Sequence, residues 1–363
     1  MIARTMRDFV TTEEIIQEAR RRLSQGCWDY LTGGSESETT LRRNRAAFDR
    51  IAFRPRVLVD VSHIDPSTTF LGHKLRIPAI LAPIGGLQEF HPDGAAEVTR
   101  AAADFGIMHA VSTITQPDLE ETAAASQAPK IFQLYVNGDL KWVEDLLARV
   151  KRAGYMALAL TVDVARYSRR ERPLLSRYQR SLQRRSDPTR RYQGEMTWET
   201  LDAIKQIWGG PFLLKGVQTA EDAALAVEHG VDVIWVSNHG GRQIDHGVGS
   251  MDTLAEVVQA VEGRARIMLD GGVQRGSDIL KAIALGADVV ALGRLQGWAL
   301  AAAGAEGVVR MLEIVEDELI SAMGLCGLTS IGQVTPKYIR PAESVTPPHE
   351  MSSWVNMPLS RIL

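Results

Sequence analysis

The amino-acid sequence predicts an α/β protein built on a closed (β/α)8 barrel, or TIM barrel, and three observations support this prediction. From residue 79 onward, short apolar runs alternate with amphipathic stretches. The runs are continuously apolar, as expected for parallel strands that are covered on both faces. Eight such units occupy about 220 residues, which suits a closed barrel. A doubly wound open sheet is the alternative, but it more often carries a glycine-rich phosphate loop after its first strand.

The predicted strands are short and evenly spaced. They are "PAILAP" (78–83), "IMHAVS" (107–112), "IFQLYV" (131–136), "ALALTVD" (157–163), "PFLLKG" (211–216), "DVIWVS" (232–237), "RIMLDGG" (266–272) and "DVVALGR" (288–294). Between them lie predicted helices, among them 94–106, 139–154, 219–230 and 276–286. Several of these helices open with Asp, Thr or Ser and end at Gly, which are the residues that cap helices.

Residues 1–78 do not share this alternation and are predicted to form a cap on the barrel. Helical patterns cover 11–25 and 37–51, and the alternation within 53–78 indicates a hairpin that closes the barrel bottom. The whole chain, 1–363, is expected to be one domain, with the barrel at 79–325 and a C-terminal tail at 326–363. An arginine-rich stretch at 166–196, poor in strand and helix signals, is the predicted mobile lid.

The composition limits the class of protein. With 41 basic and 44 acidic residues and a net charge of -3, nothing in the overall charge favours nucleic acid as a partner. Two cysteines and the lack of an apolar signal core predict a cytoplasmic protein, and no metal site is predicted. Peripheral membrane association through the basic stretch 166–191 is an alternative to a solvated lid, although no hydrophobic face accompanies it.

Polar residues gather where the predicted strands end. In a TIM barrel the active site forms at the carboxyl ends of the strands, so residues there are expected to meet at one mouth. One such residue alone is more simply explained by a surface or capping role, but a set at the end of every strand indicates a site. The set comprises Gly85, Ser112, Gln133, Tyr135, Thr161, Asp163, Arg170, Lys215, Ser237, His239, Arg242, Asp270, Gly271, Gly272, Gly293 and Arg294.

The last two strands are followed by loops suited to phosphate. "LDGGVQRG" (269–276) and "ALGR" (291–294) offer unobstructed backbone N–H groups, a cation and the start of a helix. Phosphate sites of TIM barrels lie after strands seven and eight, so a phosphorylated ligand is expected here. Either motif alone is also consistent with an ordinary glycine turn.

Motifs along nearly the whole chain resemble those of the FMN-dependent α-hydroxy-acid oxidases and dehydrogenases. This family includes glycolate oxidase, lactate oxidase, mandelate dehydrogenase and flavocytochrome b2. The resemblance rests on "WDYLTGGSESETTLRRNRAAFDR", "FRPRVLVDV", "FQLYV", "LTVD", "RRE", "LLKGV", "SNHGGRQ", "LDGGVQRG" and "LGR". It implies a TIM barrel that holds FMN and oxidises an L-2-hydroxy acid to the 2-oxo acid. It also implies O2 or another acceptor for the reduced flavin, and a homo-oligomer, either a tetramer or an octamer.

The resemblance also implies roles for the residues that act on the substrate. His239 would be the catalytic base, and Asp163 would orient and stabilise its protonated form. Arg170 and Arg242 would hold the substrate carboxylate, for which guanidinium groups suit bidentate bonding. Tyr30 and Tyr135 would contact the carboxylate and the hydroxyl. Whether His239 takes the proton of the α-carbon or that of the hydroxyl is left open by the sequence.

A second set of residues would hold FMN by the same resemblance. Lys215 would lie at the N1–O2 edge of the flavin, where negative charge develops on reduction. Asp270 would bind the ribityl chain. The remaining expected cofactor contacts are Pro83, Ile84, Gly85, Ser112, Gln133, Thr161, Ser237, Gly271, Gly272, Arg275, Gly293 and Arg294.

Four positions depart from the family pattern, and they bear on substrate and electron acceptor. Gly85 stands where many members have alanine, Ile114 replaces an aromatic residue, Gln274 replaces the first arginine of "GVRRG", and Ala165 replaces a proline. Other FMN-binding barrel enzymes of the isomerase type, a nucleotide dehydrogenase of the inosinate type and a catalytically silent flavin-binding barrel are the alternatives. The inosinate type needs a cysteine in a barrel loop, which neither Cys27 nor Cys326 supplies.

Overall fold

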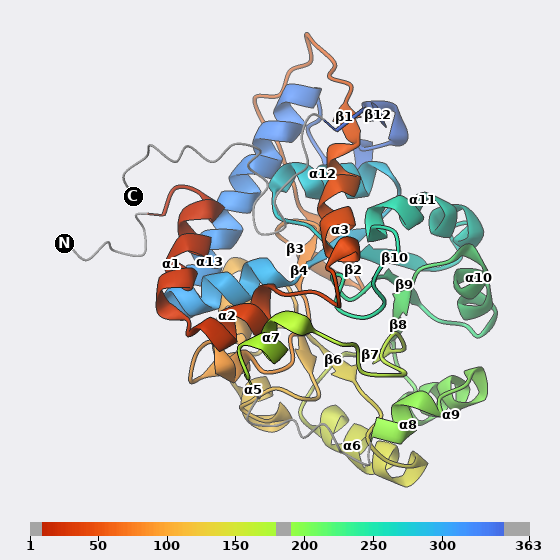
Figure 1. The fold of residues 1–363 in the computed structure, drawn as a ribbon. Helices are drawn as coiled ribbons and strands as arrows, with labels where there is room; N and C mark the ends of the chain where they lie inside the picture. Colours follow the sequence, from red (N-terminus) through yellow and green to blue (C-terminus); the bar gives the residue numbers. More distant parts are fainter. Residues whose placement is uncertain (1–8, 179–189, 345–363) are drawn as a thin grey trace.

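The computed structural model describes residues 9–178 and 190–344, and a closed barrel of parallel strands lies at its centre (Figure 1). The strands are β4 (Ala79–Leu81), β5 (His109–Ser112), β6 (Lys130–Leu134), β7 (Ala157–Thr161), β8 (Phe212–Val217), β9 (Val233–Val236), β10 (Arg266–Leu269) and β11 (Val289–Leu292). They follow one another around the ring in chain order, and β11 closes it by pairing with β4. Each predicted run coincides with one of these strands, although β6 begins one residue before its run and β8 ends one residue after its run, so the predicted TIM barrel is confirmed.

Amphipathic helices surround the barrel (Figure 1). In α6, for example, Val143, Leu147 and Val150 recur at helical spacing and are buried, and the Asp139 side chain caps the first turn by accepting a hydrogen bond from Trp142 N at 2.9 Å. The helices are α4 (Gly94–Phe105), α5 (Leu119–Ala124), α6 (Leu140–Arg152), α9 (Trp198–Trp208), α10 (Ala220–Glu228), α11 (Ser250–Val261), α12 (Gly276–Ala284) and α13 (Arg294–Cys326), the last broken at Ala303 and Gly304.

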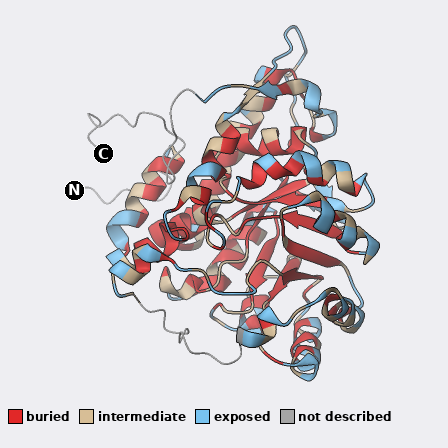
Figure 2. Cartoon of the chain, turned by 45° about the vertical axis from the view of Figure 1, so that its right-hand side comes forward, coloured by how far each residue is buried: buried red, intermediate tan, exposed pale blue. Residues whose placement is uncertain are grey.

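The barrel strands are buried on both faces, as Figure 2 shows. Their side chains fill the interior on one face and meet the helices on the other, and Phe132, Phe212 and Trp235 are fully buried. This explains why the strands lack a polar alternation. The same rigid barrel fixes the eight carboxyl ends, from which the site is built.

The N-terminal cap consists of α1 (Thr12–Arg22), α2 (Gln25–Thr32) and α3 (Thr39–Asp49). The sequence predicted α1 and α3 but not α2. The hairpin expected across 53–78 is shorter than predicted, since only β2 (Thr68–Phe70) and β3 (His73–Leu75) form it. The strand β1 (Ile51–Phe53) pairs instead with β12 (Ile339–Pro341), so the tail returns to the cap. Short 3-10 turns occur at Leu87–Glu89, Ile331–Gln333 and Pro336–Tyr338.

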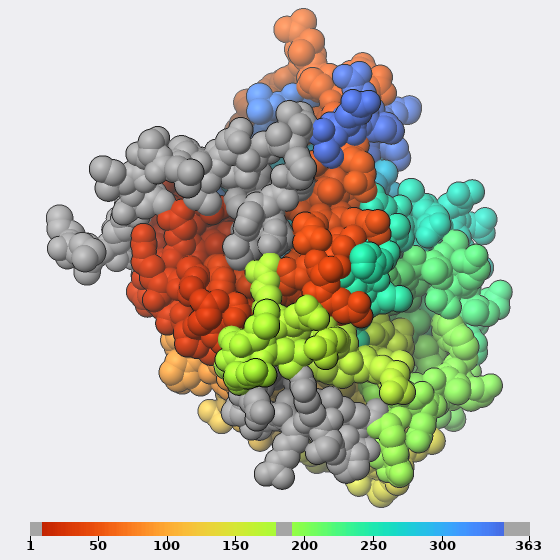
Figure 3. Space-filling view, viewed as in Figure 1, coloured from red at the N-terminus to blue at the C-terminus, as the bar shows by residue number. Residues whose placement is uncertain are grey.

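The predicted lid at 166–196 lies partly outside the described residues, which omit 179–189. Its described parts hold two short helices, α7 (Glu171–Leu175) and α8 (Arg190–Gly194). In the space-filling view, α7 lies against the red N-terminal cap, where it packs on α2 (Figure 3). Within the ranges that the structure describes, no helix is long and apolar enough to cross a membrane, and no cluster of side chains suits a metal ion.

Candidate active site

A cavity opens at the carboxyl ends of the barrel strands. It is lined by predicted site residues that come from the cap and from seven of the eight strand ends. They are Tyr30, Pro83, Ile84, Gly85, Tyr135, Arg170, Lys215, His239, Arg242, Asp270, Gly271, Gly272, Gly293 and Arg294. The strand geometry therefore brings together residues that are up to 264 positions apart, from Tyr30 to Arg294. Ile114, Ala165 and Gln274, three of the departures from the family pattern, line the same cavity.

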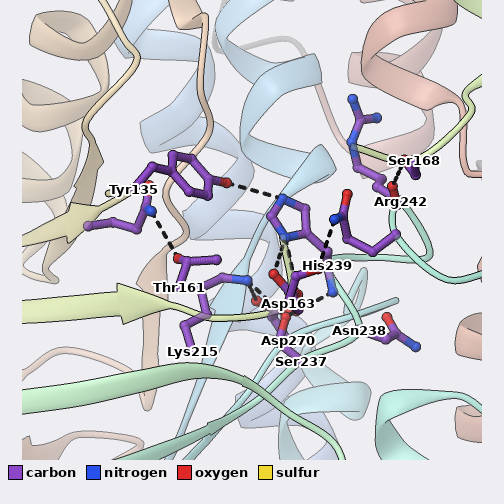
Figure 4. A network of polar contacts seen from close by, with 12 residues as sticks. Tyr135, Thr161, Asp163, Ser168, Lys215, Ser237, Asn238, His239, Arg242 and Asp270 are labelled. Atoms are coloured by element: carbon purple, nitrogen blue, oxygen red, sulfur yellow. Dashed lines mark hydrogen bonds and ion pairs between the residues drawn. The ribbon is translucent and has the colours of Figure 1, made fainter. Parts of the chain in front are cut away.

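His239 and Asp163 form a hydrogen-bonded pair at the mouth of the barrel (Figure 4). The Nδ1 atom of His239 lies 2.9 Å from Oδ1 and 3.2 Å from Oδ2 of Asp163. Burial lowers the pKa of His239, which the carboxylate of Asp163 only partly offsets. Burial alone would raise the pKa of Asp163, but the neighbouring His239 and Lys215 hold it below its ordinary value. The pair at neutral pH is thus a neutral imidazole on an ionised carboxylate, which suits a base.

The backbone aims the imidazole. His239, Gly240 and Gly241 all have positive φ values, of 58°, 63° and 74°. Gly241 N donates to Asn238 O at 3.1 Å, so His239 and Gly240 are the central residues of a tight turn of the type I′ kind. Glycine adopts this conformation freely, but a histidine does so at a cost of about 1 kcal/mol, as is common for residues that a functional site over-determines.

Tyr135 contacts the other ring nitrogen of the base. Its hydroxyl lies 3.4 Å from His239 Nε2 (Figure 4). With Nδ1–H directed at the Asp163 carboxylate, Nε2 carries the lone pair on the cavity side. A substrate in the cavity therefore meets a proton acceptor and a phenol side by side.

Two arginines meet at the same side of the cavity. Arg242 donates from Nη1 to the carbonyl oxygens of Tyr30 and Gly33, at 2.7 and 2.8 Å, and its guanidinium lies over the Tyr30 ring. Arg170 donates from Nη2 to Gln243 Oε1 at 3.1 Å. In these contacts both guanidinium groups are held by neutral protein oxygens, and both line the cavity.

Lys215 belongs to a buried polar cluster on the floor. Its Nζ donates to Ser237 Oγ at 2.9 Å and lies 3.4 Å from Asp270 Oδ2, and Ser237 Oγ donates to Asp270 Oδ1 at 2.6 Å. Ser237 Oγ also accepts from His239 N at 3.0 Å, so this cluster is joined to the turn that carries the base. Because Lys215 is only 5 % exposed, its charge acts at low dielectric on whatever occupies the cavity above it.

Three further predicted residues form a hydrogen-bonded chain across adjacent strand ends. Ser112 Oγ donates to Gln133 Oε1, and Gln133 Nε2 donates to Thr161 Oγ1, each at 2.9 Å. All three side chains are buried, but they lie beside the cavity and not among its lining residues. The structure therefore joins them to one another and leaves their contact with a ligand as a prediction.

The loops after β10 and β11 form a backbone cradle. Gly271 and Gly272 have φ values of 104° and 91°, which only glycine adopts readily, and a Cβ on Gly293 would meet open space. Arg294 is half-buried here, and it donates to the carbonyls of Thr32, Gly33 and Gly240. Burial, together with the nearby charges of Arg242 and Arg170, lowers the pKa of Arg294 to about 9. The positive charges of Arg294, Arg242 and Arg170 at this wall suit the binding of an anion.

Arg275, another predicted cofactor contact, points away from the cavity. Its Nη1 lies 2.6 Å from Glu318 Oε1 of α13, and the residue does not line the cavity. The backbone after Gln274 turns into α12 and directs this side chain outward onto α13, and its contact with the cofactor stays a prediction.

Two residues that the fold brings to the cavity, Gln193 and Arg45, were not predicted from the sequence. Gln193 of α8 donates to Thr161 O and accepts from Val136 N at 2.8 Å, which ties the end of the arginine-rich stretch to two strand ends. Arg45 of the cap also lines the cavity and forms a buried pair with Asp278, at 2.6 Å. Gln193 sits in a stretch without periodicity, and Arg45 lies within an ordinary amphipathic helix.

The features of this cavity fit FMN. The glycine cradle and the half-buried cation Arg294 suit a phosphate, and they lie after the last two strands of the barrel, as phosphate sites of this fold do. Lys215 supplies a fixed positive charge on the floor, and Asp270 supplies acceptor oxygens. Fold and site together define a TIM barrel suited to a flavin, with a histidine–aspartate pair at its mouth.

Comparisons with known proteins agree with this class. The family model described as FMN-dependent dehydrogenase matches residues 19–341. Glycolate oxidase 1 of Zea mays is 40% identical over 342 residues, which cover 88% of this chain and 93% of the relative. A peroxisomal (S)-2-hydroxyacid oxidase of Arabidopsis thaliana is 37% identical, with coverage of 92% and 97%. A crystal structure of mandelate oxidase aligns with a TM-score of 0.87 and 36% identity, covering 93% of this chain and 100% of that one. The chain belongs to the FMN-dependent dehydrogenase family, and its cofactor is FMN.

Proposed function

We propose that this protein oxidises an L-2-hydroxy acid to the corresponding 2-oxo acid, with FMN as the electron acceptor. The observation that carries the proposal is the position of His239, paired with Asp163 on one side and facing Tyr135 and two arginines on the other. A base beside a cationic clamp suits a substrate that bears both a carboxylate and a hydroxyl. The glycolate and mandelate oxidases among the relatives support the same reaction class.

FMN supplies the two-electron acceptor of this reaction. The chain would hold its phosphate at Gly271, Gly272, Gly293 and Arg294, and Lys215 would stabilise negative charge near its ring. Asp270, bonded to Ser237, is placed to accept hydrogen bonds from a polyol chain. The buried chain of Ser112, Gln133 and Thr161 supplies further amide and hydroxyl groups at the β5 to β7 edge.

Arg170 and Arg242 would orient the substrate through its carboxylate. Both line the cavity, and the guanidinium groups are held in place by the Gln243 amide and by backbone carbonyl oxygens. The Tyr30 ring beneath Arg242 keeps that guanidinium in place. Holding the carboxylate in this way directs the hydroxyl-bearing carbon toward His239 and Tyr135.

His239 would accept one of the two protons that the substrate loses. Its neutral Nε2 faces the cavity, and the carboxylate of Asp163 at Nδ1 stabilises the imidazolium that results. The hydroxyl of Tyr135, 3.4 Å from Nε2, is placed to hydrogen-bond the substrate oxygen. Proton removal from the α-carbon and from the hydroxyl both satisfy this geometry.

For the substrate side chain we favour a medium or aromatic group over that of glycolate. Ile114 is smaller than the aromatic residue expected in its place, and it lines the cavity. A Cβ at Gly85 would lie 2.7 Å from Ile114 Cγ1, so the isoleucine side chain already leans into the space behind residue 85. The similarity to mandelate oxidase structures, one of them of a variant with (S)-mandelic acid, supports this preference.

The test is anaerobic reduction of the purified yellow protein by a panel of acids. Glycolate, L-lactate, L-mandelate and longer L-2-hydroxy acids are mixed with the enzyme, and bleaching of the flavin absorbance gives a rate constant for each. At least one acid should bleach the flavin, and a medium or aromatic acid should exceed glycolate. Faster reduction by glycolate than by every larger acid rules out the side-chain preference.

The carboxylate clamp is tested with the matched neutral 2-hydroxy amides. An amide cannot form charged hydrogen bonds with the two guanidinium groups, so it should reduce the flavin much more slowly than its acid. Equal rates for acids and amides contradict the clamp and the hydroxy-acid assignment with it. Reoxidation by O2 is measured separately, as hydrogen peroxide formed per flavin.

A further inference from the structure

A residue outside the barrel is joined to the catalytic turn. Asn44 lies on α3 of the N-terminal cap, and Asn238 directly precedes His239. Their side-chain amides bond reciprocally: Asn44 Nδ2 donates to Asn238 Oδ1 at 2.9 Å, and Asn238 Nδ2 donates to Asn44 Oδ1 at 2.7 Å. Both residues are only 1 % exposed, so this paired contact forms without competition from water.

The amide of Asn238 in turn holds the turn that carries the base. Its Oδ1 also accepts from Gly241 N at 3.1 Å, and its Nδ2 also donates to Val248 O at 3.0 Å. Asn238 therefore spans both ends of the segment that contains His239. Since His239 has a left-handed backbone, contacts that fix both flanks of the turn are what keep it in this conformation.

Asn44 also contacts the loop that forms the phosphate cradle. A Cβ on Gly271 would lie 3.2 Å from Asn44 Oδ1, and one on Gly272 would lie 2.8 Å from Asn44 O. Asn44 Oδ1 accepts from Ser250 N at 3.0 Å, at the start of α11. One side chain of the cap thus lies where the catalytic turn, the start of α11 and the 270–272 loop meet.

We propose that Asn44 is a positioning residue, which holds the Asn238–Gly241 turn so that His239 is presented to Asp163 and to the cavity. It acts through Asn238 and does not itself touch the substrate. The role rests on the proposed function, in which His239 is the base. The N-terminal cap then serves the chemistry as well as the closure of the fold.

The matched control is Thr40, which also lies on α3 and also bonds the loop that follows β9. Thr40 is fully buried, and its Oγ1 bonds Ile244 O at 3.2 Å and Gly247 N at 2.9 Å, in the same loop but beyond the turn. Thr40→Val removes these bonds with little change of shape. Asn44→Ala removes the amide pair, and Asn44→Asp keeps the side-chain size but loses the donor to Asn238 Oδ1.

The experiment compares the three variants with the parent protein, each loaded with FMN. We expect both Asn44 variants to lower the rate constant of flavin reduction by about 10- to 100-fold with smaller changes in substrate affinity, because a misaimed base loses alignment. Thr40→Val should lower the Tm comparably and leave the reduction rate within about twofold of the parent. The proposal is overturned if the reduction rates of the Asn44 variants and of Thr40→Val all fall in proportion to their loss of Tm. It is also overturned if the Asn44 variants reduce the flavin at the parental rate.

A second readout does not depend on turnover. The charged and titratable groups around His239 are Asp163, Lys215, Arg170 and Tyr135. A turn that loosens weakens the contact with Asp163, so the pKa of His239, measured by NMR of labelled imidazoles and assigned with His239→Asn, should fall in the Asn44 variants and not in Thr40→Val. If no 2-hydroxy acid reduces the parent protein, the proposed function fails while this titration still decides whether Asn44 positions His239.

Discussion

The two sides of the cavity are built differently. On the side of β6, β7 and β9, side chains bond to side chains: His239 to Asp163 at 2.9 Å, and Tyr135 to His239 at 3.4 Å. On the side of β10 and β11, the wall is glycine backbone with the half-buried cation Arg294, which donates to carbonyl oxygens. The side chains of the first side hold one another in position, whereas the second side presents backbone and the positive charge of Arg294 to the cavity. Changes on the first should therefore affect rate, and changes on the second should affect affinity.

The largest expected effect is that of His239→Asn on the catalytic side. Asparagine tolerates the left-handed backbone of this turn, so the fold and FMN binding should be retained. Without the base, anaerobic flavin reduction should slow by roughly 10²–10⁴-fold or more. Stopped-flow absorbance measures it, and a variant that still reduces at the parental rate removes the imidazole from the mechanism.

Asp163→Asn should have a smaller effect on the same step, about 10- to 100-fold, because it removes one charged hydrogen bond and leaves the base. The pH dependence sharpens this expectation. His239 acts when neutral, so reduction is lost as pH falls through its pKa, which burial already places below the ordinary 6.5. Removal of the carboxylate, which raises that pKa, should move the acid limb to still lower pH. If the acid limb of the pH profile stays in place or moves to higher pH, the pairing of His239 with Asp163 is contradicted.

On the phosphate side, Arg294→Gln should weaken binding without changing the chemical step. Riboflavin lacks the phosphate, so the ratio of riboflavin to FMN dissociation constants isolates this contact. The ratio should fall by about 10- to 100-fold, the equivalent of about 1.4–3 kcal/mol for a hydrogen bond to a charged group. Fluorescence titration of the apoprotein measures both constants. An unchanged ratio would show that Arg294 does not hold the phosphate.

The smallest expected effect is that of Gln274→Arg, which adds a cation to the same wall. Gln274 lines the cavity next to the glycine cradle. The preference for FMN over riboflavin should rise by about 2- to 10-fold, and more at low than at high salt, as for a partly exposed ion pair. A preference that is equal at all salt concentrations argues against an ionic contact at this position.

The sequence by itself determined the barrel and most of the site. The continuous apolar runs predict strands because burial on both faces removes polar positions, and the carboxyl ends of parallel strands must share one mouth. For this reason the sequence predicts that residues as distant as Tyr135 and Arg294 share one cavity, and both line it. The motif resemblance then suggested their roles.

Only the tertiary structure decided the contacts that cross between elements. No local pattern says that β1 pairs with β12 and not within a long hairpin, because strand pairing depends on where the two ends of the chain meet. Arg275 and Gln274 are neighbours in the same motif, yet one pairs with Glu318 and the other lines the cavity, since the start of α12 sends successive side chains to opposite sides. Asn44 looks like any polar position of an amphipathic helix, and it meets Asn238 only because the folded cap lies against the catalytic loop. Periodicity records how each residue is buried along its own element, whereas partners on other elements are fixed by packing.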